Sequence, residues 1–197
     1  MWRTKFGHFL LKRSFEMHPL LIVFIVCTAQ ICSSQDDAKP LSDTYKSCCG
    51  IEPVTFNVGK ANVYVPNVFT PNGDGINDLF LPTINSEVKA LINFTIINVA
   101  GDTVLFNRRD VILTDPKSFA WDGKRYDGKQ HVGPFKYGMA VYNKNNELGI
   151  VEGKGCVIPC TPEMAVFRSK EGCFYPIQAG KEGTLDKSIN TAEKGCF

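Results

Sequence analysis

The sequence predicts an all-β fold, an immunoglobulin-like antiparallel β-sandwich followed by a disulfide-stapled, loop-rich C-terminal tail. Short runs rich in β-branched and aromatic residues recur between positions 54 and 151, several of them alternating between apolar and polar residues. Clusters of Gly, Asn and Asp separate these runs, and no window of about 12 residues among them keeps a helical period. Six cysteines lie beyond position 47, which is typical of an exported domain stabilised by disulfides.

Residues 1–31 are predicted to form a signal peptide. An uninterrupted apolar run at residues 20–26 follows four basic residues, Arg3, Lys5, Lys12 and Arg13. The run is too short for a membrane-spanning helix of about 20 residues, but it suits the core of a signal peptide. The chain is therefore expected to be exported.

Two ways of removing the leader stay open, and they predict different locations. Cleavage after Ala29 would release a soluble, secreted chain that begins at Gln30. Lipoprotein processing would instead cleave before Cys32 and acylate it, anchoring the protein at the outer membrane or cell surface of a bacterium. Gln30 and Ile31 are poor matches for the small residues that precede a lipidated cysteine. Residues 33–37, however, resemble the acidic export tag in lipoproteins of gliding bacteria.

The β-sandwich domain is expected to span residues 48–160, after an exposed polar tether at residues 32–47. The runs at residues 54–58 and 61–69 alternate between apolar and polar residues. The run at residues 88–99 has the β-branched richness of a core strand. These first predicted strands cover residues 54–58, 61–69, 80–81 and 88–99.

The second half of the predicted sandwich begins with a tight turn at residues 100–102, which leads into a hairpin strand. Two short edge strands are expected next, and then a clear strand whose side chains alternate between two faces. These predicted strands cover residues 103–107, 111–113, 119–121, 137–142 and 148–151. The tail at residues 161–197 contains four glycines and two cysteines, so we expect a loop-rich appendage rather than a core element.

The cysteines of the mature chain are predicted to form disulfides. Cys27 lies in the apolar run and is removed with the leader, and acylation of Cys32 would leave an even six: Cys48, Cys49, Cys156, Cys160, Cys173 and Cys196. An exported chain meets an oxidising compartment. Zinc is disfavoured, because His131 is the sole histidine beyond the leader and no cysteine pair has the spacing of a zinc knuckle.

Six cysteines allow 15 connectivities, so the pairing is a hypothesis. A bond between the neighbours Cys48 and Cys49 would distort the backbone, so each is expected to reach a distant partner. Cys156 and Cys160 are the natural candidates, which leaves Cys173 to pair with Cys196 within the tail. Each of the two long bonds would close a loop of about 100 residues and stabilise the fold by about 4 kcal/mol.

Composition limits the remaining classes of function. A chain of 197 residues with 44% hydrophobic residues is long enough for one domain with a real core. Its formal net charge of +2 comes from 22 basic and 20 acidic side chains spread along the chain. Such a distribution produces no dominant field, so nucleic acid and acidic lipid are not expected partners.

The densest turn signal, at residues 70–78, offers one candidate metal site. Hard cations such as calcium take several oxygen ligands from short acidic loops that turn at glycine, and the candidate ligands here are Asn72, Asp74, Asn77 and Asp78. The loop is not an EF-hand, because the first and last ligand positions of that motif would fall on Thr70 and Leu81. The alternative is a turn in which Asn and Asp side chains cap backbone N–H groups.

Three segments, in their order and spacing, resemble the gliding-motility-associated C-terminal domain, which is also known as the type B sorting domain of type IX secretion. They read VPNVFTPNGDGINDLF (65–80), FTIINVAGDTVLFNR (94–108) and FAWDGKRYDGKQHVGPFKYGMAVYN (119–143). The resemblance covers about residues 54–151. It implies a β-sandwich module exposed at the surface of a bacterium that has this secretion system. About 46 residues follow Val151, so the module is either a structural or adhesive unit or a displaced sorting domain of a secreted cargo.

The leading prediction is a non-enzymatic surface module that acts in envelope assembly, adhesion or gliding-related interactions. Its partners would be surface or secretion-machinery proteins, or surface glycans. The alternative is a small secreted carbohydrate-active enzyme, for which His131, Asp122 and Asp127 are the candidate groups. Asp-Gly pairs are above all turn signals and Trp121 suits a sandwich core, so the structural role is favoured for this segment.

Overall fold

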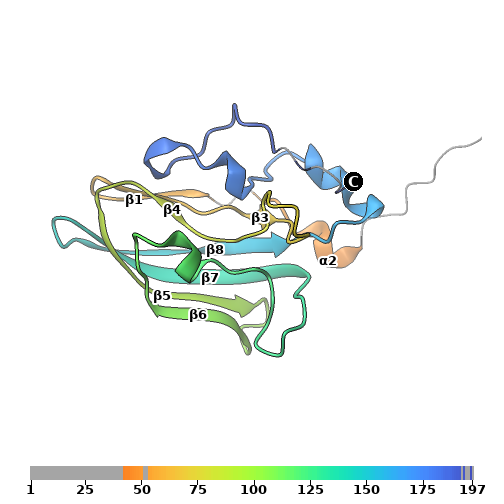
Figure 1. Cartoon of the computed structure of the whole chain (residues 1–197), viewed down its shortest axis with the longest axis horizontal. Helices are drawn as coiled ribbons and strands as arrows, with labels where there is room; N and C mark the ends of the chain where they lie inside the picture. The colour runs from red at the N-terminus through yellow and green to blue at the C-terminus, as the bar shows by residue number, and fades with distance from the viewer. Residues whose placement is uncertain (1–41, 51–52, 192, 194–195, 197) are drawn as a thin grey trace, which may run out of the picture. The chain divides into compact units, whose positions relative to one another are not determined.

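Eight strands within the described residues build two sheets that stack as a sandwich (Figure 1). The computed structural model describes residues 42–50, 53–191, 193 and 196. The smaller sheet has the order β1 (Thr55–Val58), β2 (Ala61–Tyr64), β4 (Thr83–Ile84). The larger sheet has the order β3 (Val68–Phe69), β8 (Leu148–Val157), β7 (Gly133–Asn143), β5 (Val88–Asn98), β6 (Val104–Asp110). The predicted all-β sandwich is confirmed.

The sheets are antiparallel except at one edge. β3 pairs in parallel with the end of β8, with Val68 opposite Cys156 and Phe69 opposite Val157. The chain reaches this edge directly from β2, so the predicted single strand at residues 61–69 is divided between the two sheets. This crossing places the turn at residues 70–78 beside the end of β8.

Aromatic side chains fill the space between the sheets. Alternate residues of β7 point inward and are buried, as the period of a strand requires. Phe135 of β7 contacts Phe80 and Trp121 edge-on, with ring centroids 4.8 Å and 5.1 Å away. Phe80 and Trp121 also form an isolated antiparallel bridge. The core prediction for Trp121 is therefore confirmed.

The two predicted edge strands between β6 and β7 are wrong. Residues 111–113 are irregular, although Val111 and Leu113 pack partly buried against the core. Residues 116–119 form the 3-10 helix η1 (Pro116–Phe119). Proline at the first helical position has the φ angle that a helix needs and no N–H to offer a strand.

β7 and β8 are longer than their patterns predict. β7 begins at Gly133 and runs through Pro134. Pro134 is tolerated because β5 ends opposite Phe135, so that Pro134 has a strand neighbour only on the β8 side. β8 continues to Val157 despite three glycines.

The tail forms a second, smaller core with the segment before β1. Its 3-10 helices are η2 (Pro162–Arg168), η3 (Pro176–Gln178) and η4 (Lys181–Gly183). The short helix α2 (Asp43–Lys46) lies in the segment predicted to be an exposed tether, yet its Tyr45 is buried and contacts the Phe167 ring at 6.2 Å. The end of the tether and the tail are thus packed parts of the fold.

The predicted signal peptide and Cys32 lie outside the described residues. In the part of the chain that the structure describes, no helix is both long and apolar enough to cross a membrane.

Candidate functional site

The six cysteines beyond position 47 form three disulfides, as the sequence predicts. The bonds are Cys48–Cys156, Cys49–Cys173 and Cys160–Cys196. The first agrees with the predicted pairing. The predicted partners of Cys49 and Cys196 are wrong, because Cys49 has a left-handed backbone (φ 64°) and its side chain leaves toward the tail rather than toward β8. Three disulfides indicate a protein that matures in an oxidising compartment outside the cytosol.

The turn at residues 70–78 is held by its own side chains. The carboxylate of Asp78 accepts hydrogen bonds from the backbone N–H groups of Asn72, Gly73 and Gly75 at 2.9, 2.6 and 2.6 Å. The carboxylate of Asp74 accepts the N–H two residues later at 2.8 Å. Gly73 and Gly75 have φ angles of +83° and +87°, which other residues rarely adopt. The carboxylates of this turn thus cap its backbone.

The four predicted calcium ligands do not form one set. The side chain of Asn77 leaves the turn: its Oδ1 accepts the N–H of Ile177 at 2.9 Å, and its Nδ2 donates to Glu193 and to the carbonyl of Thr191. Among the described residues, no group of three or more His, Cys, Asp or Glu side chains is placed to hold a metal ion. The side chain of Asn77 thus lies apart from those of Asn72, Asp74 and Asp78, and calcium binding by this loop stays a prediction.

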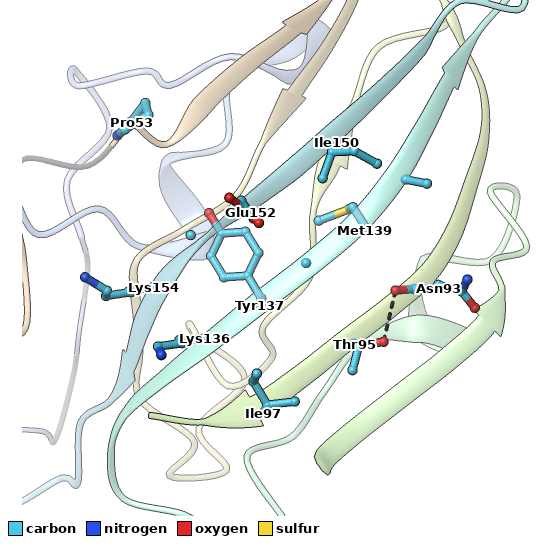
Figure 2. A pocket seen from close by; sticks show the side chains of 13 residues that line it. Pro53, Asn93, Thr95, Ile97, Lys136, Tyr137, Met139, Ile150, Glu152 and Lys154 are labelled. Carbon is cyan, nitrogen blue, oxygen red and sulfur yellow. Dashed lines mark hydrogen bonds between the residues drawn. The ribbon is translucent and has the colours of Figure 1, made fainter. Parts of the chain in front are cut away.

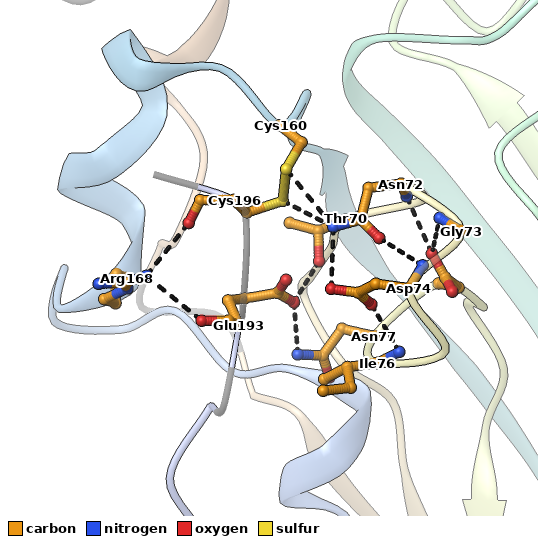
Figure 3. Close-up of a disulfide and its surroundings, with 11 residues drawn as sticks. Thr70, Asn72, Gly73, Asp74, Ile76, Asn77, Cys160, Arg168, Glu193 and Cys196 are labelled. Carbon is orange, nitrogen blue, oxygen red and sulfur yellow. Dashed lines mark hydrogen bonds between the residues drawn. A yellow bond between two sulfur atoms is a disulfide. The ribbon is translucent and has the colours of Figure 1, made fainter.

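Asn77 instead belongs to a contact between the turn and the tail (Figure 3). Glu193, which is 6% exposed, accepts hydrogen bonds at Oε1 from Thr70 and from the Nδ2 of Asn77. Its Oε2 is buried and accepts none from the described residues. Burial raises the pKa of Glu193, and the nearby carboxylates of Asp74 and Asp78 raise it further. This environment favours the neutral carboxyl group.

The disulfide Cys160–Cys196 lies directly beside this contact (Figure 3). The Nδ2 of Asn72 lies 3.0 Å from the Cys196 sulfur and 3.4 Å from the Cys160 sulfur. Arg168 donates to the backbone carbonyls of Glu193 and Cys196 at 3.3 and 3.2 Å. The end of the tail is thus joined covalently to Cys160, just after β8, and is held to the turn by several hydrogen bonds.

The groups considered for catalysis hold a turn in place. The indole N–H of Trp121 donates to the carbonyl of Lys124 at 2.7 Å, and Asp122 accepts the N–H of the same residue at 3.0 Å. Asp127 accepts the N–H of Lys129 at 3.0 Å. The ring of His131 lies 3.2 Å from the carbonyl of Pro134, and burial lowers the pKa of this histidine. These contacts agree with the structural role favoured for the segment.

A groove on the outer face of the larger sheet follows strand β7 (Figure 2). Strand pairing aligns its outward side chains in rows. Along the groove these rows are Ala140 with Ile150; Thr95 with Gly138 and Glu152; and Ile97 with Lys136 and Lys154. The floor is Gly138 and Ala140 of β7, and side chains of β5 and β8 form the walls. We call this feature, with a volume of about 750 Å³, the outer groove.

The outer groove is open and partly apolar. Ile150 is 66% exposed, and Leu148 beyond it is 54% exposed. A Cβ atom at Gly138 would meet no other atom within 4 Å, so the centre of the floor is a hollow. The sequence patterns did not predict this site, although small residues at alternate positions of the strand at residues 137–142 are a signal for it.

No protein-family model matches the chain, and no curated protein matches it. Among the solved structures similar to it is CopC from Methylosinus trichosporium OB3b, which is 9% identical and has a TM-score of 0.35. The match covers 56% of this chain and 97% of that protein. A likeness this weak says nothing of what the present chain binds.

Proposed function

We propose that this chain is an exported, non-enzymatic module of a bacterial cell surface that acts by contact through its outer groove. The resemblance to gliding-motility-associated domains supports a role of this module in envelope assembly, adhesion or gliding. Partner proteins at the surface or in the secretion machinery are the expected contacts.

The observation that carries this proposal is the exposed outer face of the larger sheet. Apolar side chains on the inner face are buried in the sandwich, whereas Ile150 and Leu148 on the outer face are exposed to solvent. A contiguous apolar area on a soluble domain is a common mark of an interaction site. The hollow at Gly138 gives this area a shape into which a side chain of the partner can fit, as a specific contact requires.

The disulfides support the exported location. Disulfides form and persist in oxidising compartments outside the cytosol, and here two of them link the small tail core covalently. Whether the mature chain is anchored depends on Cys32, which lies outside the described residues. The intact mass of the native protein distinguishes a chain that begins at Gln30 from one that begins at an acylated Cys32.

Filling the hollow tests the proposal. We expect Gly138→Val to occlude the outer groove without unfolding the protein, because the space above Gly138 is empty and valine favours strands. A strain lacking the gene, complemented with this variant, should lose surface adhesion or spreading to the extent of the deletion. Gly138→Ala is the matched control and should restore most of the function. Full function with a folded Gly138→Val protein would contradict the proposal.

A further inference from the structure

Tyr126 is the most exposed of the large apolar side chains among the described residues, at 70%. The next is Ile150 at 66%, which lines the outer groove. A single exposed apolar side chain is ordinary on a soluble protein. These two differ in their surroundings, however, because Tyr126 projects from a turn whereas Ile150 borders a hollow. One molecule thus carries both a projecting aromatic ring and a groove with an apolar wall.

The turn that carries Tyr126 is a hydrogen-bonded hairpin, which we call the 123–130 hairpin. The N–H of Gly128 donates to the carbonyl of Arg125 at 2.9 Å, and the N–H of Arg125 donates to the carbonyl of Lys129 at 2.9 Å. Gly128 has a φ angle of +77°, the left-handed conformation that closes such a turn. The hairpin therefore presents the tyrosine ring in one place, so that binding does not have to order the turn first.

The 123–130 hairpin emerges from the core side of the larger sheet. Its base is held by Trp121, which is 1% exposed in the core and donates its indole N–H to the carbonyl of Lys124 at 2.7 Å. The outer groove lies on the opposite face of that sheet, with Gly138 in its floor. Because the sheet separates the two features, Tyr126 can enter the outer groove only of another molecule.

The hollow at Gly138 has the width of an aromatic ring. The walls of the outer groove stand on β5 and β8, the neighbours of β7 on its two sides. Adjacent strands lie about 4.8 Å apart, so the walls are about 10 Å apart. Carbon atoms in contact lie about 3.5–4.0 Å apart, so one ring between two walls needs about 8 Å. Since a Cβ at Gly138 would meet no atom within 4 Å, the ring can reach the floor.

The charges beside the ring and beside the hollow are complementary. Tyr126 lies between Arg125 and Asp127, which form an exposed ion pair at 2.9 Å. The hollow has Glu152 directly opposite it on β8, and Lys136 lies two residues away on β7 (Figure 2). In the orientation that places Arg125 over Glu152, Asp127 faces Lys136. Such exposed pairs orient a contact at little cost, since the pair within the hairpin is itself weak.

We infer that the outer groove binds the 123–130 hairpin of a second copy of this chain, with the Tyr126 ring in the hollow at Gly138. This inference rests on the proposed function, since it names the partner of the same site. The hairpin and the groove are different surfaces of one molecule, so each contact leaves one hairpin and one groove free. Repetition of the contact builds an open chain of copies at the cell surface.

The test measures the mass of the oxidised protein in solution by analytical ultracentrifugation. The weight-average mass of the wild type should rise about twofold between about 10 µM and about 1 mM, as a small contact allows. Tyr126→Ala and Gly138→Val should each stay monomeric, because the first lacks the ring and the second lacks the hollow. Ile112→Ala removes another exposed apolar side chain, 60% exposed, and should associate as the wild type does.

Mixing the two variants distinguishes this contact from other forms of association. Tyr126→Ala keeps the groove and Gly138→Val keeps the hairpin, so an equimolar mixture should form dimers and nothing larger. In isotope-labelled Tyr126→Ala protein, the backbone amide signals of Lys136, Gly138 and Glu152 should shift when Gly138→Val protein is added.

Charge exchange tests the orientation of the contact. Asp127→Lys should weaken association about fivefold, as one exposed ion pair allows. Adding Lys136→Glu to the same chain should restore association, because the exchanged charges again face each other between copies.

Three outcomes would overturn the inference: a wild type that stays monomeric over this range, a Tyr126→Ala protein that associates with itself, or a mixture of the two variants that stays monomeric. Cells that adhere normally with Tyr126→Ala but not with Gly138→Val would assign the groove another partner and would also overturn it. None of these outcomes contradicts the proposed function, which fails only if cells carrying folded Gly138→Val protein behave as wild type.

Discussion

At the scale of single residues, Glu193 shows how one carboxyl group links the tail to the turn. Its donors, Thr70 and Asn77, are neutral. The guanidinium group of Arg168 donates to the backbone carbonyl of Glu193 and not to its side chain. Among the described residues, no salt bridge offsets the cost of the buried charge, and protonation lowers that cost.

The pKa of Glu193 predicts a dependence of stability on pH. Because burial raises the pKa in the folded state above its unfolded value, the stabilisation is complete below the unfolded pKa, about 4.3, and is lost as pH rises through the folded pKa. We expect Glu193→Gln, which keeps the acceptor oxygen without the charge, to exceed the wild type in stability by a margin that grows from pH 4 to pH 8. Urea unfolding at several pH values measures that margin. Parallel pH curves for the two proteins would show that Glu193 does not titrate in this range.

The sequence predicts the turn well at this scale but not its contact with the tail. Asp and Asn beside glycine cap local N–H groups, so the roles of Asp74 and Asp78 follow from their immediate neighbours. Asn77 has the same local signal, but its partner Glu193 is 116 residues away. Nothing in the pattern around either residue indicates a contact over that separation.

At the scale of elements, β7 and β8 fit together through glycines. The ring of Phe135 lies over Gly155 and that of Tyr137 lies over Gly153, each the direct cross-strand partner. A Cβ at either glycine would come within 2.5 Å of a side-chain atom. The aromatic core therefore needs these inner-face glycines, whereas Gly138 on the outer face adjoins open space.

This difference predicts opposite effects of one added methyl group. Gly155→Ala should destabilise the protein by about 2 kcal/mol, because the Phe135 ring must leave its place in the core. Gly138→Ala should be neutral or stabilise by about 0.5 kcal/mol, since alanine lowers the entropy of the unfolded chain. Denaturant unfolding of the two variants compares them directly. Equal losses of stability would mean that both positions are equally packed.

The same strands show where sequence patterns succeed and fail. β-branched richness predicts β5, and alternation predicts the centre of β7, where every second residue is buried. It misses the end of β8, where glycines replace the apolar residues that would mark the inner face. It wrongly assigns a strand to residues 111–113, because an apolar run shows burial but not strand pairing.

At the scale of the whole molecule, disulfides join distant parts of the fold. Cys48–Cys156 and Cys49–Cys173 connect the segment before β1 with β8 and with the tail. The sequence predicts that these cysteines are oxidised, since export and their even number both favour it. It does not predict that Cys49 pairs with Cys173, because the tail folds back on residues 42–50, where Tyr45 contacts Phe167.

Replacing both cysteines of one disulfide at a time should show which bond stabilises the whole fold and which stabilises only a local part of it. Cys48–Cys156 closes 108 residues that include the whole sandwich, so Cys48→Ala with Cys156→Ala should lower the free energy of unfolding by about 4 kcal/mol. Cys160–Cys196 closes 36 residues and joins the end of the tail to the segment after β8, beside the turn. Cys160→Ser with Cys196→Ser should therefore speed amide hydrogen exchange in the turn and tail while β5 and β7 stay protected. Exchange that rises equally in all strands of the second variant would show that the tail stabilises the sandwich itself and is not a separately opening unit.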